Sequence, residues 1–185
     1  MKAKEGLEFP LIEVDLSSDK STAKALGEVR ERFGSKIDAV LHLVAFFDFS
    51  GEESPLYETV NVEGTRRLLR ALQDFEVGRF IYSSTMLVHA PCDPGEYIDE
   101  RQPIGPGWAY PKSKARAEAV IREEHGRIPY AILRFAGVYD EQSSVPTLAH
   151  QIARIYERDL QSYFYSGSVD VGQAIFLGEQ AIAPS

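Results

Sequence analysis

A tyrosine and a lysine four residues apart form the pair in this chain that is best suited to proton transfer. In Tyr110-Pro111-Lys112-Ser113-Lys114, this spacing places Tyr110 and Lys114 on one face of a helical turn. A free tyrosine titrates near pH ~10, so it keeps its proton at neutral pH. A neighbouring ammonium would favour the phenolate and lower the pKa of Tyr110. The pair therefore predicts a general acid and base, tuned by the lysine.

A second group of polar side chains precedes this pair. The segment Ile81–Thr85 is rich in β-branched and aromatic residues and ends in three hydroxyls, which predicts a strand with a polar end. The carboxyl ends of strands are where α/β sheets build their sites. Ser83 and Ser84 are interpreted as structural residues of the strand end.

Five segments occur in the order and at the spacing found in one known family. Together they resemble the extended short-chain dehydrogenase/reductase superfamily, in its NAD-dependent epimerase/dehydratase branch, over roughly residues 8 to 140. The segments are Val14-Asp15-Leu16, the strand Val40–Ala45, Asn61-Val62-Glu63-Gly64-Thr65, Ser83-Ser84-Thr85, and Tyr110 with Lys114. A tyrosine and lysine at this spacing would alone be weak support, whereas the ordered set is specific.

The resemblance implies a role for each matching residue. Tyr110 would exchange the proton of a substrate hydroxyl, Thr85 would donate a hydrogen bond to the same oxygen, and Lys114 would also bind the nicotinamide ribose. Asn61 would support the site through a kinked helix and water. The catalytic residues implied are Thr85, Tyr110, Lys114 and Asn61; the cofactor-binding residues implied are Asp15, Leu16, Leu43, Val44, Ala45, Tyr110, Lys114, Phe135 and Ala136.

One of these positions and a group of aromatic side chains keep a second interpretation. An aspartate after a strand is often only a turn residue, so Asp15 could either contact the adenine or close a turn. The aromatic residues Phe46, Phe47 and Phe49 could line a substrate pocket beside the cofactor or pack in the core. Gly137 stands where nucleotide-sugar epimerases of this superfamily usually carry an asparagine that helps to hold the substrate, which argues against nucleotide-sugar recognition and leaves the substrate open.

Strand and helix patterns alternate along the chain, which predicts an α/β fold: a partial Rossmann-like, doubly wound parallel sheet with flanking helices. The last predicted helix, Thr147–Leu160, is amphipathic. The expected strands are Phe9–Val14, Ile37–Ala45, Arg79–Ser84 and Ala131–Phe135; the expected helices run from a Ser17 or Ser18 cap to Phe33, from Ser54-Pro55 to Phe75, from Tyr110 to Glu124 and from Thr147 to Leu160, and Pro91–Trp108 is an expected loop.

Glycine-rich turns that carry a cofactor pyrophosphate open most members of this superfamily, and the sequence has no G-x-x-G-x-x-G or G-x-G-x-x-G. We therefore expect residues 1–145 to be a truncated NAD(P)-binding Rossmann-like domain that starts at about the third strand. Residues 146–185 are expected to be a remnant of the C-terminal substrate lobe.

Composition excludes several other classes of function. The net charge of −8 and the pI of about 5.1 argue against nucleic acid or an anionic membrane as a partner. The four histidines lack metal-ligand spacing, so no metal site is expected, and the single Cys92 cannot form an internal disulfide. The longest apolar run is too short to span a bilayer, and no signal peptide is recognised, so a cytoplasmic location is expected.

Two functions from different classes remain. The chain could be an oxidoreductase or epimerase that uses NAD or NADP on a sugar or another small hydroxyl or carbonyl substrate. It could instead be a catalytically inactive, truncated relative that acts as a binding or interaction module. Without a pyrophosphate turn, cofactor binding is expected to be weak or absent.

Sheet order adds an expectation about assembly. In the family, the strand that matches Val40–Ala45 pairs with a first strand that is missing here, which would leave one edge bare. We expect the strand Phe9–Val14 to pair directly with Leu41–Ala45, or otherwise the chain to form a homodimer through this exposed edge.

Overall fold

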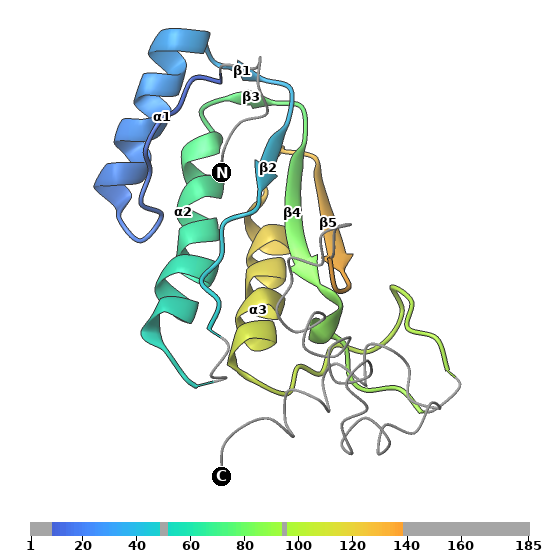
Figure 1. Cartoon of the computed structure of the whole chain (residues 1–185). Coiled ribbons are helices and arrows are strands. Elements are labelled where there is room, and N and C mark those ends of the chain that lie inside the picture. The colour runs from blue at the N-terminus through green and yellow to red at the C-terminus, as the bar shows by residue number, and fades with distance from the viewer. Residues whose placement is uncertain (1–8, 49–51, 94–95, 139–185) are drawn as a thin grey trace, which may run out of the picture.

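The computed structural model of the 185-residue chain describes residues 9–48, 52–93 and 96–138. Helices and strands alternate over this part of the chain (Figure 1). The elements are α1 (Asp19–Phe33), β1 (Lys36–Ile37), β2 (Val40–His42), a π-helical segment (Tyr57–Val62) that leads into α2 (Glu63–Leu72), β3 (Glu76–Val77), β4 (Phe80–Thr85), a 3₁₀ turn (Met86–Val88), α3 (Ala109–Glu124) and β5 (Tyr130–Phe135). The expected helix Thr147–Leu160 and the expected lobe remnant, 146–185, lie outside the described residues.

Helix α1 begins and ends where its capping residues predict. The Ser18 hydroxyl accepts a hydrogen bond from the backbone N–H of Ser21 at 3.3 Å, which satisfies one of the free amides of the first turn. Gly34 ends the helix with φ at 86°, a left-handed conformation that glycine adopts without strain, and its N–H donates to the Arg30 carbonyl.

The main sheet is parallel and has the order β2-β4-β5, with Val40 beside Phe80 and Phe80 beside Tyr130. The short strands β1 and β3 form a separate parallel pair. The predicted α/β class, with a parallel sheet and flanking helices, is confirmed.

One expected strand, Ile37–Ala45, is instead two short strands separated by a bend. The bend at Asp38 lies directly against Gly78, where a Cβ atom would come within 2.5 Å of the Asp38 carbonyl oxygen. Only glycine allows this approach, and hydrogen bonds on either side, from Gly78 N to the Ile37 carbonyl and from Val40 N to the Arg79 carbonyl, hold the two bends together. The sheet therefore turns at this point, and β2 ends at His42.

The expected strand Phe9–Val14, and its pairing with Leu41–Ala45, are both wrong. Residues 9–14 form no strand, and Figure 1 shows this segment running beside α1. The cause lies at Leu16, which packs against Gly64, while Arg67 of α2 donates to the Leu16 carbonyl. These contacts hold the start of α1 on the outer side of α2.

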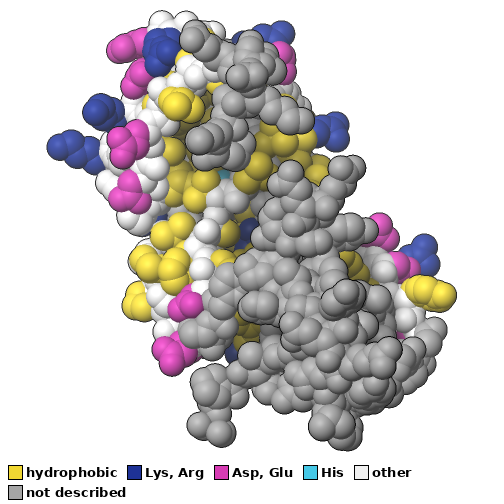
Figure 2. Space-filling view, viewed as in Figure 1, with side chains coloured by type: hydrophobic (Ala, Val, Ile, Leu, Met, Phe, Trp, Pro, Cys, Tyr) yellow, Lys and Arg dark blue, Asp and Glu magenta, His cyan; other side chains and the backbone are white. Residues whose placement is uncertain are grey.

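The hydrophobic core lies between one face of the sheet and the two helices α2 and α3. Phe80 and Tyr82 point from β4 into this core, where they meet residues of both helices, including Leu69, Ala117 and Ile121. The other face of the sheet is more open: Leu41 is 64% exposed, and Leu133 is also exposed. Figure 2 shows hydrophobic side chains gathered over the region of β2 and β4.

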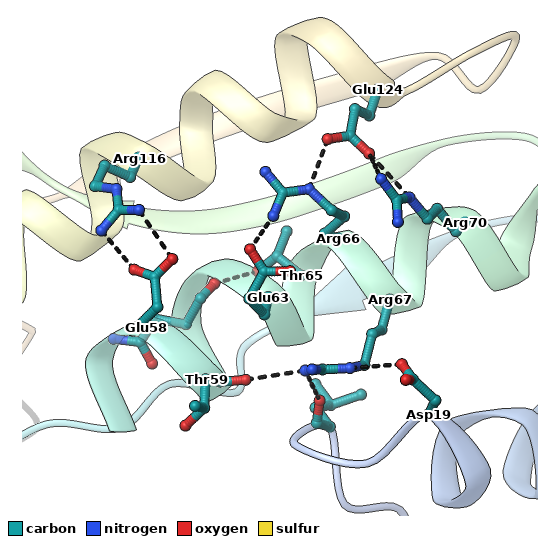
Figure 3. A network of polar contacts seen from close by, with 12 residues as sticks. Asp19, Glu58, Thr59, Glu63, Thr65, Arg66, Arg67, Arg70, Arg116 and Glu124 are labelled. Carbon is teal, nitrogen blue, oxygen red and sulfur yellow. Dashed lines mark hydrogen bonds and ion pairs between the residues drawn. The ribbon is translucent and has the colours of Figure 1, made fainter. Parts of the chain in front are cut away.

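Ion pairs join the three helices at the surface (Figure 3). Arg66 of α2 binds both Glu63 and Glu124, which links α2 to α3. Arg67 binds Asp19 at the start of α1 at 2.6 Å. Surface ion pairs of this kind typically stabilise a fold by at most about 1 kcal/mol each, so they contribute little to the stability of this one.

Candidate active site

The first turns of α3 carry the two residues that the sequence singled out. Pro111 is tolerated there because the amides of the first turn have no partner within the helix. Tyr110 is half-buried, and Lys114 lies one turn later with only 2% of its surface exposed. Lys112, on the same turn, is exposed. The helix thus buries one lysine and exposes the other.

The Lys114 side chain is a cation that is almost fully buried. Its Nζ atom lies 4.3 Å from the centre of the Tyr82 ring, which attracts it electrostatically. Burial lowers the pKa of Lys114 to about 8, and the nearby Glu118 carboxylate acts in the opposite direction. At neutral pH the ammonium is therefore charged, but it releases its proton more easily than an ordinary lysine.

Aromatic rings surround the Tyr110 phenol. The Phe47 ring meets it edge-on with centroids 4.7 Å apart, and the Trp108 and Tyr57 rings lie 5.7 and 6.5 Å away. Burial, and to a lesser extent Tyr57, raise the pKa of Tyr110. The structure contradicts the expectation of a lowered pKa for Tyr110, because burial disfavours the charged phenolate. Of the aromatic group expected near the site, Phe49 lies outside the described residues.

Asn61 joins three separate elements through one side chain. Its amide receives a hydrogen bond from Phe46 N at 2.6 Å and donates to the Phe46 carbonyl at 3.0 Å. It also donates to the Ser113 hydroxyl at 2.8 Å, and Ser113 in turn donates to the Tyr110 carbonyl. The helix is π-helical at Asn61, whose carbonyl accepts from the Thr65 hydroxyl at 2.6 Å. This irregular turn brings Asn61 to the first turn of α3.

The three hydroxyls at the end of β4 have different surroundings. Ser83 donates to the His42 carbonyl, and Ser84 donates to the Glu118 carboxylate at 2.6 Å. The Thr85 hydroxyl oxygen caps the following 3₁₀ turn by accepting from Leu87 N at 3.3 Å. Ser83 and Ser84 are thus bound to neighbouring elements, as expected of structural residues. Thr85 is buried at the strand end, and α3 packs against both β4 and the turn that follows it.

The residues expected at the adenine end lie near the start of α2. Asp15 is exposed, and its carboxylate accepts from the backbone and hydroxyl of Ser17, which lowers its pKa. Leu16 is buried against Gly64, one turn after Asn61. A Cβ atom at Gly64 would lie 3.1 Å from the Leu16 Cβ, so glycine allows this close approach. Asp15 therefore closes a turn and keeps part of its carboxylate free.

The remaining residues expected to contact the cofactor lie at the carboxyl ends of strands. Leu43 and Val44 follow β2 and are exposed, while Ala45 is partly buried. Phe135 ends β5 beside Thr85 in the sheet register, and Ala136 follows it; both are exposed. These positions share one end of the sheet because parallel strands end on the same side.

A nicotinamide cofactor fits part of this arrangement. Lys114 and Tyr110 supply a buried cation and a phenol, and the exposed ends of β2 and β5 supply apolar surface. Over residues 9–48, 52–93 and 96–138, no glycine-rich turn opens a helix toward a pyrophosphate. The described residues therefore suit the nicotinamide and ribose, and the group that would bind the pyrophosphate is not assigned.

Among the described residues, the two buried histidines, His42 and His89, are bonded to neighbouring elements of the fold. Burial and the Lys114 charge lower the pKa of His42 to about 4, so it is neutral, and its Nε2 bonds the Thr65 hydroxyl at 2.9 Å. His89 binds Arg134 and the Gln102 carbonyl. Within the described part of the chain, no three His, Cys, Asp or Glu residues are grouped in a way that could hold a metal ion. None of the described helices is long and apolar enough to cross a membrane.

Sequence reasoning missed two residues of the site, Ser113 and Glu118. Both lie on the buried face of α3, three residues after Tyr110 and four after Lys114. That spacing on one helical face was a usable signal, because polar residues facing a core need partners.

A parallel sheet with a hydroxyl, a phenol and an ammonium at one end, next to an Asn-x-x-Gly-Thr helix, defines a Rossmann-like fold of the short-chain dehydrogenase/reductase class. The family model described as "NAD dependent epimerase/dehydratase family" matches residues 2–169. The chain therefore belongs to the NAD-dependent epimerase/dehydratase family.

Known relatives agree with this assignment. The chain is 37% identical over 108 residues to human dTDP-D-glucose 4,6-dehydratase, an alignment that covers 56% of this chain and 31% of that protein. The structure of UDP-glucuronic acid 4-epimerase from Bacillus cereus, in complex with UDP-glucuronic acid and NAD, matches with a TM-score of 0.58 and 25% identity, over 74% of this chain and 42% of that one. The enzyme WbmH of Bordetella bronchiseptica, in complex with NAD+, has the same fold, with a TM-score of 0.65 and 21% identity, over 85% of this chain and 50% of that one. The chain thus matches about a third of the length of its curated relatives.

Proposed function

We propose that this chain carries the proton- and hydride-transfer half of an NAD(P)-dependent oxidoreductase or epimerase that acts on the hydroxyl or carbonyl of a sugar-type substrate. The observation that supports it best is the pair on α3: a buried ammonium at Lys114 one turn after a half-buried phenol at Tyr110. A surface helix would leave both side chains in water. Burying a lysine costs free energy, which suggests a use for its charge.

Tyr110 acts on the substrate oxygen. Because its pKa is raised, the phenol keeps its proton at neutral pH and is prepared to donate it to a carbonyl oxygen. In the reverse direction it accepts the proton of a hydroxyl. Thr85 donates a hydrogen bond to the same oxygen while negative charge develops there. A bound nicotinamide would supply or accept the hydride.

Lys114 binds the cofactor ribose and supplies positive charge behind the phenol. Asn61 holds the first turn of α3 in place through Ser113, so that Tyr110 keeps its orientation. Asp15, with part of its carboxylate free, is assigned to the adenine end, and Phe135 and Ala136 to the face of the nicotinamide.

The sugar-type substrate rests on the relatives. The human relative is a dTDP-D-glucose dehydratase and the Bacillus cereus structure contains UDP-glucuronic acid, so both act on or bind sugars attached to nucleotides. Aromatic rings such as Phe47 and Trp108 beside Tyr110 suit the apolar face of a sugar ring. The choice between NAD and NADP is left to experiment.

The test is a reaction of the purified chain with NAD and either dTDP-D-glucose or UDP-glucuronic acid, followed by chromatography of the products. We expect Tyr110→Phe to lower kcat by about 10²–10⁴-fold, as is typical when a general acid or base is removed. Tyr97→Phe is the matched control, because Tyr97 is almost fully exposed. Full activity in Tyr110→Phe would overturn the proposed mechanism.

A second function, a binding or interaction module without catalysis, is supported by the lack of a pyrophosphate-binding turn in the described residues. It predicts no turnover with either nucleotide sugar, together with unchanged ligand binding in Tyr110→Phe.

A further inference from the structure

A buried carboxylate on α3 collects four hydrogen bonds from three elements. The Glu118 side chain is 1% exposed. Arg134 of β5 donates to both of its oxygens, at 3.0 Å from Nε and 2.7 Å from Nη2. Ser84 of β4 donates at 2.6 Å, and Arg122 of α3 donates at 2.8 Å. These bonds outweigh the effect of burial and hold the pKa of Glu118 below its usual range, so the group is a carboxylate at neutral pH.

Two of the three partners of Glu118, Ser84 and Arg134, lie next to a residue of the candidate active site. Ser84 directly precedes Thr85, and Arg134 directly precedes Phe135. Glu118 itself lies one helical turn after Lys114. One carboxylate thus connects the helix that carries the phenol and ammonium to the two strand ends that carry the hydroxyl and the expected nicotinamide contact.

The same network reaches the segment before α3. Arg134 also contacts the Nε2 atom of His89 at 3.1 Å, and the His89 Nδ1 lies 2.9 Å from the Gln102 carbonyl. Because arginine can only donate, His89 accepts at Nε2 and donates from Nδ1. His89 also forms an antiparallel bridge with Ile104. The chain that leads to Tyr110 is therefore tied to the same arginine.

We infer that Glu118 is a positioning residue that fixes the Tyr110–Lys114 helix against the ends of β4 and β5, so that Thr85, Tyr110 and Lys114 keep one mutual arrangement. Its importance for turnover rests on the proposed function, whereas its effect on the arrangement does not. A carboxylate with two-point binding to arginine suits this task, because the paired bonds fix its direction as well as its position.

The charge of Glu118 has a second effect on the same site. The titratable groups that interact with the Lys114 ammonium are Glu118 on its own helix, Tyr82 on β4 and His42 on β2, and Tyr110 lies one turn before it on the same helix. His42 is neutral and Tyr82 and Tyr110 keep their protons, so Glu118 is the anion among them. The Glu118 carboxylate raises the pKa of Lys114, whereas burial lowers it. The pKa of Lys114 therefore reports on the charge of Glu118, and the loss of a residue that only supports the fold would not change it.

The test compares Glu118→Gln with Glu124→Gln in the full chain. Glu124 lies on the same helix and is also held by two arginines, Arg66 and Arg70, but it contacts α2 rather than the strands. Nuclear magnetic resonance on protein labelled at lysine side chains, threonine methyls and tyrosine rings would follow Lys114, Thr85 and Tyr110. Thermal unfolding of both variants is measured as a control, to establish that each is folded.

In Glu118→Gln we expect Lys114 to titrate at lower pH than in the wild type, and the Thr85 methyl and Tyr110 ring signals to shift. In Glu124→Gln all three should stay as in the wild type. A folded Glu118→Gln protein with unchanged titration and unchanged signals would overturn the inference. Neither readout needs cofactor or turnover, so a chain that shows these shifts but binds no NAD contradicts the proposed function alone.

If Glu118→Gln does not fold, Ser84→Ala tests the positioning role of Glu118 instead. It removes one bond to the carboxylate without leaving a buried charge unpaired, and Ser83→Ala is its control because Ser83 binds the His42 carbonyl instead. We expect the Tyr110 and Lys114 signals, which lie on the other element, to shift in Ser84→Ala and not in Ser83→Ala. Equal spectra for the two variants at α3 would contradict the inference.

Discussion

Burial moves the pKa values of both Tyr110 and Lys114, and it moves them in opposite directions. It raises the pKa of the phenol and lowers that of the ammonium to about 8, because in each case the charged form is disfavoured. The resulting pair is a protonated acid beside a cation that gives up its proton readily. A phenolate would therefore need a further stabilising partner, such as the hydroxyls of a bound ribose.

Lys114→Met tests this burial at the residue scale. The wild-type ammonium is disfavoured in the folded state below a pH of about 8, and this cost disappears as the pH rises toward the 10.5 of an exposed lysine. The unfolded chain binds more protons in that window, so wild-type stability gains with pH there. We expect Lys114→Met to be more stable by about 1–2 kcal/mol at neutral pH, after allowing about 1 kcal/mol for the lost contact with the Tyr82 ring.

Urea unfolding across this pH range measures the difference. The difference in the free energy of unfolding between Lys114→Met and the wild type should shrink as the pH rises from about 8 toward 10, before tyrosine ionisation lowers the stability of both proteins. Lys112→Met, at an exposed position, should show no such trend. A stability difference that stays constant with pH would contradict the burial of a charged Lys114.

Sequence alone located this pair and predicted its shared helical face, because spacing determines which side chains of a helix are neighbours. It gave the wrong direction for the Tyr110 pKa. The reason is that the rings around Tyr110 come from distant segments: Phe47 follows β2 and Tyr57 begins the irregular helix. Desolvation by such residues depends on tertiary packing, which spacing does not report.

At the scale of elements, short side-chain bridges determine how the helices meet the sheet. Capping and periodicity predicted α1 and the region of α3, and β4 and β5 were found within a residue or so of their expected bounds. The bend at Gly78 and the strand pair β1 and β3 were not predicted, and the π-helical turn at Asn61 was expected only as the kinked helix that the family resemblance implies. Each depends on a contact between segments far apart in the sequence, as between Asp38 and Gly78.

Asn61→Ala tests the bridge between the irregular helix and α3. The substitution leaves the Phe46 N–H and carbonyl without their side-chain partner and removes the bond to Ser113. With about 1 kcal/mol or more for each buried bond that is lost, we expect the free energy of unfolding to fall by about 2–4 kcal/mol.

Ser113→Ala is the matched comparison, because it removes only the Ser113 end of this bridge. We expect a loss of about 1 kcal/mol in the same urea titration. If both variants lost the same small amount, Asn61 would not be the residue that joins these elements.

At the scale of the whole molecule, one face and one edge of the main sheet stay open in the described residues. No described strand pairs with the outer edge of β2, and Leu41 and Leu43 are exposed beside it. The segment that the sequence analysis chose to cover this edge, Phe9–Val14, forms no strand there. Contacts of Leu16 with α2 decide where that segment lies, and a strand pattern contains no information on them.

An open edge with apolar neighbours favours association with a second copy. We therefore predict that the chain forms dimers as its concentration rises, which sedimentation equilibrium measures. Leu41→Lys should weaken this association by at least about tenfold, because it puts a charge beside the edge. Leu11→Lys, at a position 89% exposed in a segment that forms no strand, should leave it unchanged. A wild-type chain that stays monomeric at all concentrations would contradict this prediction.

We propose that Tyr110 and Lys114 form part of the binding site of a nicotinamide dinucleotide, and isothermal titration of the chain with NAD and NADP measures this binding. Without an assigned pyrophosphate turn we expect weak binding, with a Kd on the order of 1 mM. Lys114→Met should abolish the heat of binding, and Lys112→Met, which removes an exposed charge from the same turn, should keep it. Equal binding by both variants, or no binding by the wild-type chain, would contradict the claim.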